Sequence, residues 1–122
     1  MEQIKEVMRQ MINVSEVELN DFLSGASIKT FKRQEIISQP NSIPNEIFFI
    51  NKGIVRVLIS DSEGAEHTIH FALENQFVAD YSTFIQKKPS LYTLQTLEET
   101  QVVVLPRAAI EWGYSNLKED EK

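Results

Sequence analysis

The spacing of apolar residues changes at Gly25, and this change limits what the chain can fold into. Before Gly25, apolar residues recur every three or four positions, which is typical of one face of an amphipathic helix. After Gly25, short apolar segments alternate residue by residue and are separated by turn residues. Many short strands of this kind predict an antiparallel sandwich or barrel.

Two helices are predicted before Gly25. The apolar face of the first consists of Ile4, Val7, Met8, Met11 and Ile12. The second begins at Ser15, because Ser15 and Glu18 match a capping box in which each side chain binds an otherwise free backbone N–H. Gly25 stands where a left-handed C-terminal cap is expected.

About eight short strands are predicted after Gly25. The recognisable ones cover residues 28–33, 35–38, 46–51, 54–60, 65–73, 91–97 and 101–105. The clearest hairpin joins residues 54–60 to 65–73 through a tight turn at 61–64. Asn75 is expected to accept a left-handed backbone in the next turn, and residues 78–86 fit one short helix.

A last helix is predicted over residues 107–117, because Pro106 suits the start of a helix. A helix this short needs tertiary contacts to be stable. We therefore expect Ile110 and Trp112 to pack it onto the strands.

Composition excludes several classes of protein and of functional site. The chain has 122 residues, the size of one domain, and no cysteine, which excludes zinc fingers, iron–sulfur clusters, disulfide scaffolds and thiol catalysis. Its 12 basic and 18 acidic residues give a net charge of −6, so this segment alone is expected not to bind DNA. No apolar run is long enough to span a membrane, and the N-terminus has no signal-peptide core. A cytoplasmic protein is predicted.

The residues that enzymes commonly use are missing or badly spaced. His67 and His70 are three apart on one predicted strand, so they should face opposite sides of the sheet and share no metal ion. A cupin-like enzyme is therefore disfavoured. Phosphate-binding loops, dinucleotide fingerprints and nucleophile elbows are absent from the sequence, and we expect no catalytic residue.

An ordered set of motifs runs from Lys29 to Leu105. It comprises the strand pair 47–53 and 55–57, the turn 61–64, the sequence Phe77-Val78-Ala79-Asp80, and Pro89-Ser90 ahead of the strand that ends at Pro106. In this order the chain resembles the cyclic nucleotide-binding domain of the Crp/Fnr family of transcription regulators. The resemblance implies a mainly β fold: an antiparallel double-stranded β-helix, or jelly-roll-like β-roll, with flanking α-helices.

The resemblance also implies a domain organisation. Residues 1–25 would be N-terminal helices, 26–106 the cyclic-nucleotide-binding-like β-roll, and 107–122 the start of the C-terminal dimerisation helix, with the DNA-binding domain absent. The chain would be a piece of a longer regulator or a stand-alone sensor, and its all-charged ending favours a piece. A homodimer through the C-terminal helix is expected if the natural chain is longer.

The phosphate-binding cassette of that family departs from its pattern here. Ala79 stands at the place of a glycine, Asp80 at that of a glutamate, and Ser90 at that of an arginine, followed by Leu91 and Tyr92. The loss of a charged hydrogen bond to a buried anion costs on the order of 2–4 kcal/mol, or about a hundredfold in affinity. Cyclic AMP is therefore expected to bind weakly or not at all. No cofactor is predicted, although a cyclic nucleotide or another small anionic effector stays as the less favoured choice.

The strand over residues 65–73 corresponds to the one that lines the purine side in the family. Ile69, Phe71 and, from the opposite face, His70 are therefore further pocket candidates. Gln34 and Asn41 stand near places where the family has turn glycines. Two functions remain open: a ligand-sensing domain with an altered effector, and a stand-alone β-roll that binds proteins and has no small-molecule ligand.

Overall fold

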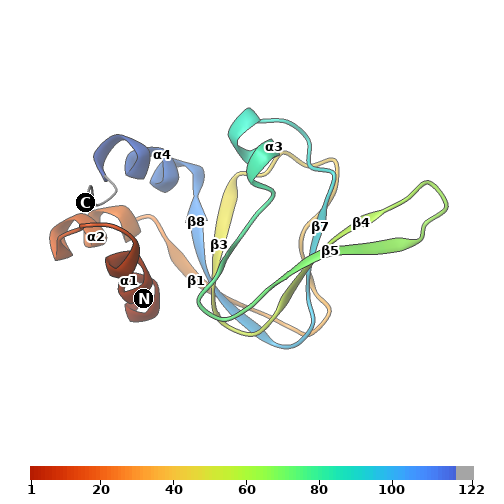
Figure 1. Cartoon of the computed structure of the whole chain (residues 1–122), viewed down its shortest axis with the longest axis horizontal. Coiled ribbons are helices and arrows are strands. Elements are labelled where there is room, and N and C mark those ends of the chain that lie inside the picture. The colour runs from red at the N-terminus through yellow and green to blue at the C-terminus, as the bar shows by residue number, and fades with distance from the viewer. Residues whose placement is uncertain (118–122) are drawn as a thin grey trace.

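The computed structural model describes residues 1–117, which form two four-stranded antiparallel sheets. Figure 1 shows the sheets facing each other in a roll. The strands are β1 (Ser27–Phe31), β2 (Ile36–Ser38), β3 (Glu46–Lys52), β4 (Val55–Ser60), β5 (Glu66–Ala72), β6 (Phe77–Val78), β7 (Thr93–Thr96) and β8 (Thr100–Pro106). One sheet has the order β1-β8-β3-β6 and the other β2-β7-β4-β5. The predicted antiparallel β-roll is confirmed.

Three helices, α1 (Glu2–Met11), α2 (Glu16–Leu23) and α4 (Arg107–Asn116), gather at one end of the roll beside β1 and β8 (Figure 1). The predicted capping box is present, with the Glu18 N–H donating to the Ser15 hydroxyl at 3.1 Å and the Ser15 N–H to the Glu18 carboxylate at 2.9 Å. The prediction for Gly25 is wrong. Ser24 caps α2 in the right-handed conformation, and Gly25 does not have a positive φ, because an Ala26 N–H to Leu23 C=O bond already turns the chain.

Two apolar clusters make the core, and β3 contributes to both. Phe49 packs with α1, α2 and β8 residues, whereas Phe48 and Ile50 pack between the two sheets. Successive side chains of a strand point to opposite faces, so an unbroken apolar run is what a strand with two buried faces requires. The dense apolar run within the strand predicted over 46–51 is of this kind, and all five residues from Ile47 to Asn51 are buried.

The trailing helix packs as predicted. Ile110 and Trp112 of α4 contact the cluster under the helices while staying partly accessible. Trp112 also lines a small cavity with Phe22 of α2 and Pro106. Within the described residues, no helix is both long enough and apolar enough to cross a membrane.

Several turns use a left-handed backbone without glycine. Gln34 has φ 62°, Asn41 and Asn75 both have φ 70°, and Lys87 has φ 55°. Asn75 was expected to do this. Gln34 and Asn41, which stand near the family's turn glycines, adopt the same backbone region that glycine reaches at no steric cost.

The β4–β5 hairpin corrects the prediction about the histidines. His70 lies opposite Val57, and His67 lies opposite Ile59, because Ile69 is an extra residue in β5 that forms a bulge. Val57 and Ile59 share one face of β4, so the two histidines also lie on one face. The His67 ring beside Asp61 lowers the pKa of that carboxyl. Even so, residues 1–117 contain no group of histidines and acids suited to hold a metal ion.

One short helix was predicted over residues 78–86, but the structure has a helix over only part of this range. Phe77 and Val78 pair with Phe49 and Phe48 as β6, and the helix α3 (Tyr81–Gln86) begins only afterwards. The strand forms because its apolar side chains cover the edge of β3, which sequence spacing over so few residues does not reveal.

Candidate functional site

The candidate site is built around α3, which β6 holds at the edge of the first sheet. Asp80 caps the helix: its carboxylate accepts the Thr83 N–H at 3.4 Å, and its carbonyl accepts the Phe84 N–H at 2.9 Å. The helix ends at Lys87, where the backbone turns left-handed. The cassette expected from the sequence covers this short helix and the loop after it.

Asp80 and Ser90 meet inside this cassette. The Ser90 hydroxyl donates to the Asp80 carboxylate at 2.8 Å and accepts the Tyr92 N–H at 3.0 Å. Both side chains are buried, with 7% of Asp80 and 1% of Ser90 exposed. Within residues 1–117 the Asp80 carboxylate has no salt-bridge partner. This corner therefore holds a carboxylate and a neutral hydroxyl bonded to each other, at the two positions where the resemblance implies a glutamate and an arginine.

The rest of the predicted site is more scattered. Ala79 is half-buried against the cluster under the helices, Tyr92 packs on the cluster between the sheets, and Leu91 is 64% exposed. Ile69, His70 and Phe71 lie on β5, the exposed edge strand of the second sheet. The sequence predicted that Ile69 and Phe71 share one face of this strand and that His70 faces the other. In the structure His70 lies opposite the buried Val57, whereas Phe71 lies opposite Arg56.

Arg107 belongs to the site although the sequence gave no reason to select it. Its guanidinium donates to the carbonyls of Phe84 at 2.8 Å and Pro44 at 2.6 Å, and lies 4.0 Å from the centre of the Phe84 ring. It thus joins the first residue of α4 to the end of α3 and to the loop before β3. The only signal in the sequence was its position directly after Pro106, where a helix begins.

Backbone bonds tie the same loop to Ser90. The Ser90 N–H donates to the Ser42 carbonyl at 2.8 Å, and the Asn41 N–H donates to the Ser90 carbonyl at 2.7 Å. Residues 39–45, which connect β2 to β3, are therefore part of the wall around the cassette.

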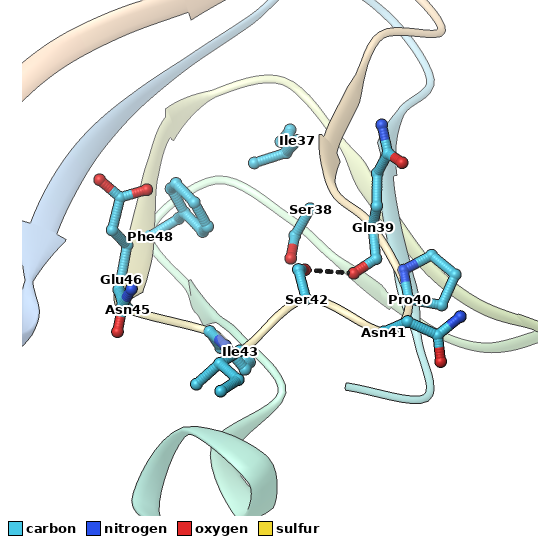
Figure 2. Close-up of a pocket in the computed structure, with 11 residues that line it drawn as sticks. Ile37, Ser38, Gln39, Pro40, Asn41, Ser42, Ile43, Asn45, Glu46 and Phe48 are labelled. Atoms are coloured by element: carbon cyan, nitrogen blue, oxygen red, sulfur yellow. Dashed lines mark hydrogen bonds between the residues drawn. The ribbon is translucent and has the colours of Figure 1, made fainter. Parts of the chain in front are cut away.

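A pocket of about 520 Å³ opens on the other side of this loop. Figure 2 shows it between β2, the loop and the start of β3, with Ile37 and Phe48 at its base. Neither Asp80 nor Ser90 lines it. The sequence analysis did not anticipate this pocket, because its walls come from three segments that only the fold brings together.

Tyr81, the first residue of α3, lines a separate apolar cavity of about 310 Å³ with residues of α1 and α4. Burial raises the pKa of Tyr81 to about 12. Tyr81 stays 44% exposed, and the apolar wall on its other side disfavours the phenolate.

Comparison with known proteins agrees with the architecture. Residues 28–115 match the family described as the cyclic nucleotide-binding domain. The chain belongs to this family. No curated protein matches the chain in sequence.

Solved structures share the fold at low identity. The sensor domain of the transcriptional regulator DNR from Pseudomonas aeruginosa is 15% identical, with a TM-score of 0.78 over 93% of this chain and 72% of that one. The catabolite activator protein of Thermus thermophilus is 14% identical, with a TM-score of 0.71 over 82% of this chain. This chain spans 46% of the Thermus protein.

Most of these neighbours are regulatory proteins. An EAL enzyme, 14% identical with a TM-score of 0.67 over 77% of this chain and 83% of that one, also carries the fold. At such identities the likeness establishes the fold alone, so function has to be argued from the site.

Proposed function

We propose that this chain is the ligand-sensing regulatory domain of a Crp/Fnr-like transcription regulator, with a degenerate phosphate-binding cassette that does not take cyclic AMP in the usual way. The observation that carries the proposal is the buried 2.8 Å hydrogen bond from Ser90 to Asp80. It leaves a carboxylate and a neutral hydroxyl where a cyclic phosphate needs a cation. Without a cation at position 90, nothing offsets the repulsion between the Asp80 carboxylate and a cyclic phosphate, and like charges repel more strongly in such a corner than in water.

Nearby cations do not replace the missing arginine. Lys87 and Lys88 are exposed in the loop after α3, and a flexible ammonium is a poor substitute for a bidentate guanidinium. Arg107 is close in space but already donates to two carbonyls and stacks on Phe84. A cyclic phosphate would have to break these contacts to recruit it.

Arg107 supports the regulatory part of the proposal. Because it holds α3 and α4 together, a ligand that moves the cassette would also move the trailing helix. In this proposal residues 1–25 and 26–106 form the helical cap and the sensing roll. In this proposal α4, which covers Arg107–Asn116, takes the place of the start of the regulator's dimerisation helix, and the protein acts in the cytoplasm. The part of the predicted helix that covers residues 118–122 lies outside the described residues. The proposed domain carries out no catalysis and needs no cofactor.

Calorimetry with cyclic AMP tests the cassette. We expect no binding by the wild type at micromolar concentration, and a gain of about tenfold or more in the triple variant Ala79→Gly, Asp80→Glu, Ser90→Arg. The matched control replaces Ser90→Arg by Ser90→Gln, which adds bulk without charge and should show no gain. Micromolar binding by the wild type would overturn the proposal, and so would an equal gain in the control.

A second candidate is a protein-interaction module with no small-molecule ligand. Ile69, Phe71 and Leu73 expose 54%, 51% and 47% of their surfaces along the edge strand β5 and the residue after it. An exposed apolar edge strand is a common docking surface for an extended peptide. A thermal-shift screen separates the two functions, since a small molecule at a hundred times its dissociation constant should add about 2.7 kcal/mol of stability. A sensor should respond to at least one metabolite, and an interaction module to none.

A further inference from the structure

The pocket beside the loop has an apolar base and a polar rim. Phe48 is buried and Ile37 half-buried, and both pack on the cluster between the sheets. The polar residues that line the pocket are Ser38, Gln39, Asn41, Ser42, Asn45 and Glu46. Figure 2 shows Glu46 and Asn45 at one end, and Gln39 and Asn41 at the other. A pocket of this size with an apolar base and a few polar groups is typical of small-molecule sites.

The polar side chains of the rim are not used by the fold. Within residues 1–117, the side chains of Gln39, Asn41, Asn45 and Glu46 form no hydrogen bond or salt bridge, and the Ser42 hydroxyl donates only to the Gln39 carbonyl at 2.6 Å. Such groups face water, and a ligand can take the place of that water at little cost.

The wall of the pocket is held in place before any ligand arrives. Four bonds fix the loop from its far side: Asn41 and Ser42 to Ser90, and Pro44 and Asn45 to Arg107, at 2.6–2.8 Å. A site that is already ordered avoids the entropy cost of closing a loop around its ligand.

The charge of the rim indicates the class of ligand. Among residues 1–117, Glu46 is the sole ionisable residue that lines the pocket, and it is acidic. The remaining polar groups are neutral amides and hydroxyls. We propose that this pocket binds a small amine with an apolar body, its ammonium group at Glu46 and Asn45 and its body on Phe48 and Ile37. This inference goes beyond the proposed function and does not depend on the cassette.

The site is tested by adding a small ligand to the whole chain and recording the backbone amide NMR signals at each concentration. The probe is phenethylamine, compared with phenylacetate and 2-phenylethanol, which share the ring but carry negative or no charge. We expect phenethylamine to shift the backbone amides of Ser38, Gln39, Asn41 and Asn45. It should bind more tightly than the alcohol, and phenylacetate should not bind. Equal or tighter binding of phenylacetate, or shifts centred elsewhere in the chain, would overturn the proposal.

Two variants locate the site. Glu46→Gln keeps the shape of the side chain and should weaken phenethylamine about fivefold, while Glu98→Gln, an exposed acid in the turn before β8, should leave binding unchanged. Ser38→Phe should fill the pocket and abolish binding, with Ser62→Phe in the β4–β5 turn as its control. Unchanged affinity in both Glu46→Gln and Ser38→Phe contradicts the proposal, whatever happens to cyclic-nucleotide binding.

Discussion

The two sides of the 39–45 loop use polar residues in opposite ways. On the cassette side, Asp80 and Ser90 are buried and satisfy each other. On the pocket side, Asn45 and Glu46 are exposed and have no side-chain partner within residues 1–117. Buried polar groups must be paired for the fold to be stable, whereas exposed ones are free to bind something else. Asp80 and Ser90 therefore use their polar atoms on each other, whereas the described side chains at the rim of the pocket leave theirs unused.

The largest expected effect is on the cassette side. Ser90→Ala removes the donor to a buried carboxylate and the acceptor of the Tyr92 N–H, so it should lower the free energy of unfolding by about 2–3 kcal/mol. Urea denaturation followed by Trp112 fluorescence measures it.

The matched control is Ser42→Ala on the pocket side, where the hydroxyl is exposed. It should cost less than about 1 kcal/mol. Equal losses of unfolding free energy in Ser90→Ala and Ser42→Ala would show that the buried hydroxyl matters no more to stability than the exposed one.

A smaller effect is expected where the two regions meet. Arg107→Lys keeps the charge but loses the planar stacking on Phe84 and one of two carbonyl contacts. We expect a loss of about 1–2 kcal/mol, with NMR shifts in both α3 and the 39–45 loop. Arg33→Lys, at an exposed turn position, serves as the control. Shifts confined to one region would mean that Arg107 does not join them.

The smallest effect is a pH dependence in the base of the cassette. Burial raises the pKa of Tyr81 to about 12, above its usual value of 10.0. The neutral phenol is thus favoured by folding, so its contribution is fully present below pH 10 and is lost as the pH rises through about 12. Tyr81→Phe should make alkaline unfolding less steep over this range, as followed by circular dichroism. An unchanged slope would place the Tyr81 ring in water.

Local sequence predicted the regular elements well. The capping box at Ser15, the left-handed Asn75 and the tight turn before β5 all depend on a few adjacent residues, and all three are present. The predictions failed where neighbours in space decide. Gly25 was not needed as a left-handed cap, and the bulge at Ile69 brought His67 and His70 to one face. Such a bulge is set by how β5 pairs with β4 and leaves no clear trace in β5 itself.

The sequence by itself determined that this chain alternates between helix and strand periods, lacks the common catalytic motifs, and carries Asp80 and Ser90 in place of the family's residues. Only the tertiary structure decided that these two side chains bond to each other, that Arg107 reaches a carbonyl 63 positions away, and that the loop walls a second pocket. The physical reason is that spacing along a chain fixes which face a side chain occupies. Contacts between distant faces depend instead on how the two sheets close around their common core.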